Sequence, residues 1–75
     1  MQVTIRYFAY LREKRGLAVE QIIVDTPMRI DELFRKIFGE IPTGVRFAVH
    51  QEFVEPSYRL EDGDEVGFLP PVGGG

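Results

Sequence analysis

One stripe of apolar residues with helical spacing stands in the middle of this short chain, and segments of alternating polarity lie on both sides of it. The stripe follows the spacing i, i+3, i+4, i+7 and i+8, which is the period of a helix with one buried face. Its members are Ile30, Leu33, Phe34, Ile37 and Phe38. A single helix of this kind needs an opposing apolar surface, and the alternating segments are the candidates to supply it.

The two ends of this helix are marked unequally. Acidic residues fall in its expected first turn and basic residues near its end, an arrangement that suits the helix dipole. Gly39 is the expected C-cap, because glycine readily adopts the left-handed conformation that ends a helix. Thr26, which precedes Pro27, is the expected N-cap.

Alternation of apolar and polar residues predicts the strands. In the first strand, residues 2–9, the odd-numbered apolar residues point to one side and Phe8 points to the other. The second strand is expected to pair antiparallel with the first, after a short helical segment that stops at Gly16. The second strand is expected over residues 19–25, and the three later strands over residues 45–50, 52–55 and 65–69.

The order of these elements predicts the fold class. Two strands, a helix, two strands and a last strand fit an α+β roll, with a mixed sheet of four to five strands and one main helix packed on one face. A turn at Asp62-Gly63 precedes the last strand, and Pro70 ends it because proline cannot donate to a strand ladder. The domain is expected to span residues 1–69, and residues 70–75 are expected to form an extended, flexible tail.

Composition narrows the classes of function. The 75 residues include no cysteine, so no disulfide, cysteine nucleophile or cysteine ligand is expected. His50 is the only histidine, which gives little support to a histidine metal site or a catalytic triad. The net charge of −3 disfavours nucleic acid, and no apolar run reaches the ~20 residues of a membrane span. We expect a cytoplasmic protein that binds no metal, nucleic acid or membrane.

The chain closes with PPVGGG, residues 70–75. Fully extended, these residues span about 20 Å at ~3.3 Å each, and the two prolines are expected to hold the base of the arm away from the domain. Three residues without side chains could thread a channel too narrow for a Cβ atom and place the Gly75 carboxylate in a partner's active site. Adenylation by ATP would make this carboxylate an acyl donor open to a sulfur nucleophile. A flexible end or a cloning remnant is the alternative that composition alone favours.

Strand parity predicts a docking surface at the root of this tail. If the odd-numbered residues of the first strand face the core, Phe8 faces outward, and Leu69 of the last strand does the same. Clustered exposed apolar residues are typical of a docking surface, whereas single ones are ordinary. Arg12 could add a bidentate polar contact at the rim.

The run EDGDE, residues 61–65, offers four carboxylates. Paired acids could bind a metal or transfer protons, but a solvated turn is favoured because Asp-Gly is strong turn chemistry. The closing glycines have no helix behind them, so the sequence contains no phosphate-binding loop.

Three stretches carry a resemblance to a known family: YFAYLREKRG near the start, FAVHQEFV in the middle and LEDGDEVGFLPPVGGG at the end. They resemble the small subunit of molybdopterin synthase, a ubiquitin-like sulfur carrier, over essentially the whole chain. The most specific part is the ending, where DGDEV, an apolar pair, PPV and a Gly-Gly follow one another. The resemblance implies the β-grasp (ubiquitin-like) fold.

The resemblance also implies a mechanism. In the family, an E1-like activating enzyme uses ATP to adenylate the terminal glycine, which then becomes a thiocarboxylate. The tail inserts into the large subunit, where the sulfur passes to precursor Z and forms the dithiolene of molybdopterin. Carried over to this sequence, Gly75 is the reactive residue and Gly74 is its partner in the Gly-Gly end.

The same resemblance implies an assembly of two small and two large subunits, in which this chain binds no cofactor and is not an enzyme alone. The residues expected to bind the large subunit are Phe8, Arg12, Leu69, Pro70, Pro71, Val72 and Gly73.

Two positions depart from the family pattern, since His50 stands where Asn is frequent and Gly73 stands where Ala or Ser often precedes the Gly-Gly. A VGGG ending also occurs among the carriers of thiamine synthesis, and carriers for tRNA thiolation or cysteine synthesis share the fold. A ubiquitin-like protein modifier, or a binding module whose tail carries no sulfur, is the alternative of another class.

Overall fold

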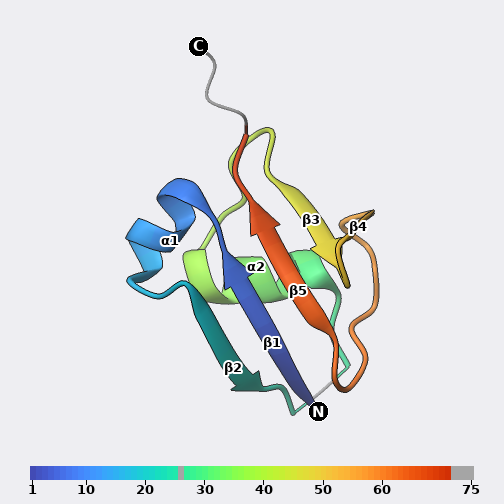
Figure 1. Cartoon of the computed structure of the whole chain (residues 1–75). Coiled ribbons are helices and arrows are strands. Elements are labelled where there is room, and N and C mark those ends of the chain that lie inside the picture. The colour runs from blue at the N-terminus through green and yellow to red at the C-terminus, as the bar shows by residue number, and fades with distance from the viewer. Residues whose placement is uncertain (26, 72–75) are drawn as a thin grey trace.

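The helix expected in the middle of the chain lies across one face of a five-stranded sheet, as Figure 1 shows. The structure is a computed structural model that describes residues 1–25 and 27–71. In chain order the elements are β1 (Gln2–Tyr7), α1 (Ala9–Arg15), β2 (Val19–Ile23), α2 (Ile30–Phe38), β3 (Arg46–Val49), β4 (Glu52–Val54) and β5 (Glu65–Leu69).

The sheet has the order β2-β1-β5-β3-β4, so the last strand lies at its centre. β5 is parallel to β1 and antiparallel to β3, and the two outer pairs, β1 with β2 and β3 with β4, are antiparallel. The mixed sheet, the α+β class and the antiparallel pairing of the first two strands are therefore confirmed. The strand ends differ from the expected ones by one or two residues, except at β5.

The core fills the space between α2 and the inner face of the sheet. The ring of Phe34 on α2 lies 5.0 Å from that of Phe68 on β5 and 5.8 Å from that of Phe47 on β3, centroid to centroid. The odd-numbered residues of β1 and the even-numbered apolar residues of β5 are buried against them. The parity predicted for both strands is confirmed, and each buried side chain of this size contributes about 1.5–3 kcal/mol.

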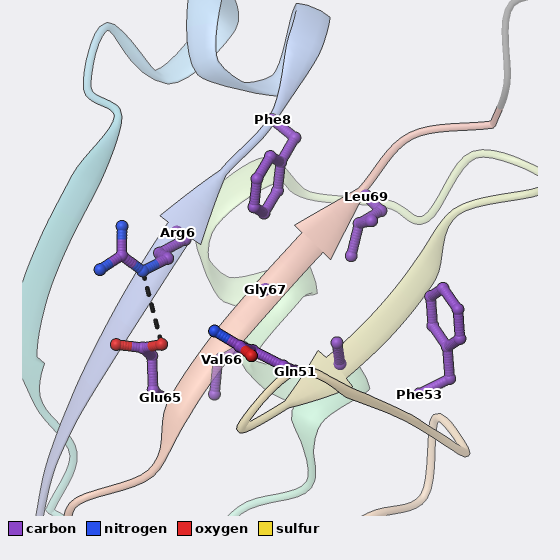
Figure 2. Close-up of a pocket in the computed structure, with 9 residues that line it drawn as sticks. Arg6, Phe8, Gln51, Phe53, Glu65, Val66, Gly67 and Leu69 are labelled. Atoms are coloured by element: carbon purple, nitrogen blue, oxygen red, sulfur yellow. Dashed lines mark ion pairs between the residues drawn. The ribbon is translucent and has the colours of Figure 1, made fainter.

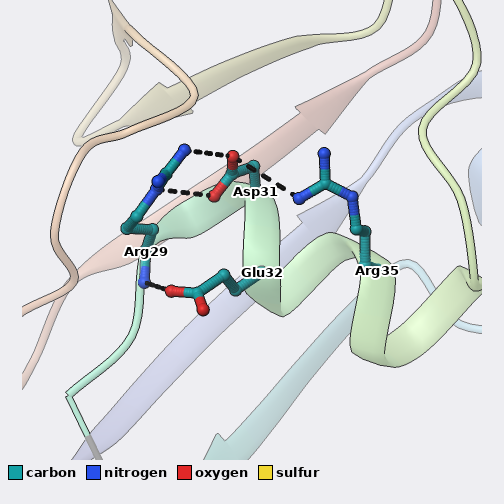
Figure 3. A network of polar contacts seen from close by, with 4 residues as sticks. All are labelled: Arg29, Asp31, Glu32 and Arg35. Carbon is teal, nitrogen blue, oxygen red and sulfur yellow. Dashed lines mark hydrogen bonds and ion pairs between the residues drawn. The ribbon is translucent and has the colours of Figure 1, made fainter.

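Charged residues hold the start of α2 (Figure 3). The Arg29 backbone N–H donates to Glu32 at 2.8 Å, and the Arg29 guanidinium donates to both carboxylate oxygens of Asp31 at 2.7 and 3.1 Å. The Arg35 guanidinium lies 3.6 Å from the same carboxylate. Asp31 as a whole is only 3% exposed. Arg29 is the N-cap residue, whereas Thr26, the expected N-cap, lies outside the described residues.

Two glycines end the helices as predicted. Gly39 follows α2 and its N–H donates to the Arg35 carbonyl at 2.8 Å, and Gly16 at φ 80° follows α1 and donates to the Arg12 carbonyl at 2.8 Å. The first strand, however, stops at Tyr7 rather than continuing to residue 9. Ala9 adopts a φ of 50°, which takes the backbone out of the extended conformation directly after Phe8 and starts α1.

The turn predicted at Asp62-Gly63 is present, with Gly63 at φ 87°. The expectation of a fully solvated acidic turn is wrong for Asp64, which is 5% exposed. Its carboxylate accepts the Glu61 N–H at 2.8 Å and the Tyr58 hydroxyl at 3.2 Å. Burial, together with the nearby Asp64 charge, raises the pKa of Tyr58. This carboxylate is buried because its partners lie within the turn and on the neighbouring loop.

The backbone that leaves β5 is packed against the domain at its first two residues. Pro70 is partly buried, and a Cβ atom built on Gly44 would lie 2.8 Å from the Cβ of Pro71. Pro71 thus lies against the loop before β3, whereas the sequence had predicted prolines that hold the chain away from the domain. Residues 72–75 lie outside the described residues.

Candidate functional site

The face of the sheet opposite α2 has two small residues at its centre. The pairing register places Gly67 of β5 between Arg6 of β1 and Ala48 of β3, and it places Ala48 opposite Phe53 of β4. Because Gly67 and Ala48 rise so little above the backbone, the outer face is hollowed into a groove of about 160 Å³ along β5.

Apolar side chains from three parts of the chain form the walls of this groove: Phe8 before α1, Leu69 of β5 and Phe53 of β4 (Figure 2). A Cβ atom built on Gly67 would lie 3.5 Å from a ring carbon of Phe8 and 3.5 Å from a methyl carbon of Leu69, so both side chains lean over the glycine. Phe8 is 43% exposed and Phe53, on the far side, is 57% exposed. The three residues form an open apolar surface of the kind that marks a binding site.

Polar groups border the apolar walls. The Arg6 guanidinium lies 3.5 Å from the Glu65 carboxylate at one edge of the groove, and Arg46 lies 3.7 Å above the Phe53 ring at another. Gln51, in the turn between β3 and β4, also lines the groove. An apolar centre with a polar border is the usual anatomy of a protein–protein interface.

A partly exposed polar network holds the segment next to Phe8 in place. The Tyr7 hydroxyl donates to Glu20 at 2.8 Å, and the Arg15 guanidinium donates to both Glu20 oxygens at 2.9 and 2.7 Å. These bonds join β1, β2 and the end of α1. Phe8 lies between β1 and α1, where it is the N-cap residue of α1. Burial and the Glu20 hydrogen bond raise the pKa of Tyr7, while the Arg15 hydrogen bonds lower the pKa of Glu20.

The structure places only part of the predicted site together. Phe8 and Leu69 face outward side by side, as strand parity predicted, whereas Arg12 is exposed on α1 and is not among the residues that line the groove. Pro70 and Pro71 continue directly from Leu69. The other predicted site residues, Val72, Gly73, Gly74 and Gly75, lie outside the described residues.

Of the residues that line the groove, the sequence had singled out only Phe8 and Leu69 for docking, and it missed Phe53 and Gln51 among others. Phe53 belongs to a strand of three residues, too short to show a period of two, and Gln51 belongs to the turn before it. The one available signal was an aromatic residue beside a turn in the stretch HQEFV.

Within residues 1–25 and 27–71, no group of three or more potential metal ligands is present. No helix in the same residues has the length and apolar character to cross a membrane.

A mixed sheet with its last strand at the centre and one helix across the inner face define a ubiquitin-like β-grasp domain, here with an apolar groove along that last strand. The sequence matches the ThiS family over residues 5–75. The chain belongs to the ThiS family.

Two relatives with the same name are similar to this chain along its length. The molybdopterin synthase sulfur carrier subunit of Chlamydomonas reinhardtii is 32% identical and aligns over 100% of both chains. The subunit of that name from Homo sapiens is also 32% identical, over 99% of this chain and 94% of its own.

Solved structures share the fold. A Pyrococcus furiosus protein, named provisionally as subunit 1 of molybdopterin converting factor, is 30% identical with a TM-score of 0.82, over 96% of this chain and 99% of its own. SAMP1 from Haloferax volcanii has the same TM-score of 0.82 at 20% identity, with 100% of both chains covered. A complex of subunits 1 and 2 of the molybdopterin-converting factor from Helicobacter pylori contains a similar chain, with a TM-score of 0.65 at 22% identity and 100% of both chains covered.

Proposed function

We propose that this chain is a sulfur carrier and the small subunit of a molybdopterin synthase. The observation that carries the proposal is the similarity, along the whole chain, to two relatives named as sulfur carrier subunits of that enzyme. The apolar groove along β5 supports it, because residues 70–75 continue from the strand that forms the floor of the groove. A docked partner would therefore receive the tail close to the docking surface.

The chemistry of the proposal resides in the carboxylate of Gly75. In the first step, a carboxylate oxygen attacks the α-phosphorus of ATP on an E1-like activating enzyme, which forms the acyl adenylate and releases pyrophosphate. A donor of sulfur at the sulfide level then attacks the acyl carbon, displaces AMP and leaves a thiocarboxylate. On the large subunit, this sulfur passes to precursor Z as part of dithiolene formation, and hydrolysis of the acyl–sulfur bond returns Gly75 to the carboxylate. Two thiocarboxylates supply the two sulfurs of one dithiolene. The small chain contributes a positioned acyl-sulfur group, and its share of catalysis is proximity.

The partner in this proposal is the large subunit, in an assembly of two small and two large chains in the cytoplasm. The complex from Helicobacter pylori supports a two-subunit arrangement for a chain of this fold. On this chain, Phe8, Leu69 and Phe53 are the apolar anchors of the contact, with Pro70 and Pro71 beside them. Arg12 is exposed on α1 and serves the rim of a wider contact.

Intact mass and reconstitution test the proposal together. After incubation with the activating enzyme, ATP and a sulfur donor, we expect a mass gain equal to the replacement of one oxygen by one sulfur. The chain without Gly75 is the control, and it should fold normally but gain no sulfur. Chemically prepared thiocarboxylate on Gly75 should then convert precursor Z in the presence of the large subunit and leave it unchanged without the large subunit.

Other outcomes of these experiments point to the alternatives. Sulfur transfer by the chain that lacks Gly75 would end the carrier proposal. Transfer to an enzyme of thiamine synthesis, tRNA thiolation or cysteine synthesis, with no conversion of precursor Z, would keep the carrier chemistry and change the pathway. A mass gain equal to a whole protein would instead identify a protein modifier.

A further inference from the structure

The turn between β3 and β4 adopts a conformation that its residues do not favour. Val49 pairs with Glu52, so the hairpin loop consists of only His50 and Gln51. Both have positive φ angles, 49° for His50 and 70° for Gln51. Two positive φ angles in a two-residue loop are the mark of a type I′ turn, for which Asn-Gly is the favoured sequence. Residues with long side chains are strained in this conformation.

Contacts within the domain account for His50 but not for Gln51. The His50 imidazole Nε2 lies 3.2 Å from the buried Asp64 carboxylate, and the His50 N–H donates to the Glu65 carbonyl at 2.9 Å. In contrast, no hydrogen bond reaches the Gln51 side chain from the residues that the structure describes. Gln51 instead lies at the groove, above the backbone of β5 near Val66 (Figure 2).

The position of Gln51 suits a recognition role. Phe8, Leu69 and Phe53 offer apolar surface that accepts many partners, and the Arg6 side chain at the groove already faces Glu65. The primary amide of Gln51 is uncharged and offers two donors and one acceptor, which match the C=O and N–H of a peptide group. Once a partner covers the groove, a polar group left without a bond costs affinity, so such a group discriminates between partners.

We propose that Gln51 is a specificity-determining residue of the docking surface, and that its amide hydrogen-bonds a main-chain peptide group of the large-subunit segment that occupies the groove. This inference rests on the proposed function. It explains why a strained glutamine occupies a turn position at which glycine would be more stable: the side chain is used in binding rather than in folding.

Three variants separate recognition from folding. Gln51→Gly removes the amide and relieves the backbone, so we expect a three- to tenfold loss of affinity for the large subunit of the same organism, with a melting temperature of the isolated chain that rises by about 4 °C. Gln51→Met removes the amide but keeps the side-chain length and the strain. It should lose as much affinity without the rise in melting temperature. His50→Asn changes the neighbouring turn residue, and its affinity should stay within about twofold of the wild type.

Calorimetric titration of the large subunit with each variant, and thermal unfolding of each variant alone, supply the two readouts. Unchanged affinity in both Gln51 variants would overturn the inference while the proposed function stands, because the wild-type chain still binds. If Gln51→Gly binds weakly but Gln51→Met binds like the wild type, the affinity depends on the backbone of the turn rather than on the amide. The inference is wrong in that case too. If the wild-type chain does not bind the large subunit, the proposed function fails and this inference fails with it.

Discussion

The two faces of the sheet use the same strands for different purposes. On the inner face, Val66 and Phe68 of β5 are fully buried beneath α2. On the outer face, Gly67 between them lies at the floor of an open groove, and Leu69 forms part of its wall. Neighbouring positions of β5 therefore alternate between residues that are buried in the core and residues that line the open groove. Because strand side chains alternate, the two roles can be altered separately.

The largest effect is expected on the inner face. Phe68→Ala removes a ring that contacts Phe34 and Phe47, and the cavity it leaves should lower the free energy of unfolding by about 3–5 kcal/mol. Leu69→Ala, one residue further along on the opposite face, is the matched control and should cost less than about 1 kcal/mol. Urea unfolding of both variants measures the difference. Equal losses would mean that the two faces do not have separate roles.

The next effect is expected on the outer face and in binding. Phe8→Ala and Phe53→Ala should each weaken binding to the large subunit by about 1–3 kcal/mol, since each removes an apolar anchor of the groove. Neither should change the melting temperature appreciably, because both side chains are substantially exposed in the isolated chain. A large fall in melting temperature with unchanged affinity would show that these side chains belong to the core.

A smaller effect in binding is expected at the floor of the groove. In Gly67→Ala the new Cβ would lie at ordinary contact distances, 3.5 to 3.7 Å, from Phe8, Leu69 and Ala48. The fold should tolerate the methyl group, which would fill part of the proposed docking groove and weaken binding to the large subunit by about 1 kcal/mol. Titration calorimetry tests this value. Unchanged affinity would indicate that the partner does not reach the centre of the sheet.

The smallest effect is expected at the network of Tyr7, Arg15 and Glu20. Glu20→Gln should cost about 0.5–1 kcal/mol of stability at neutral pH, because the pair is partly exposed to solvent. The pKa of Glu20 is lowered in the folded state, so its contribution is complete above its ordinary value of 4.5 and is lost as the pH falls through the lowered pKa. Melting temperatures of the variant and the wild type should converge in acid. A difference that persists there would exclude the ionised carboxylate as its cause.

Local patterns predicted the elements and the pairing of β1 with β2, but not the rest of the strand order. The stripe from Ile30 to Phe38 defined α2, and strand parity identified Phe8 as outward-facing, because both depend on the period of a single element. The central position of β5 depends on pairing with β1, some sixty residues earlier, which no local pattern contains. The burial of Asp64 likewise depends on Tyr58 and His50, which are brought to it only by the folded backbone.

The central position of β5 has a consequence for the life of the molecule in the cell. β5 is synthesised after every other described strand, yet β1 and β3 both need it as their common neighbour. A chain interrupted before residue 65 would leave β1 and β3 each with an unpaired edge and would lack Val66 and Phe68 of the core, so we expect it to be prone to proteolysis and aggregation. We therefore expect proteolysis to act selectively on molecules that lack β5, so that intact β5 and the point from which Pro70 continues are retained together.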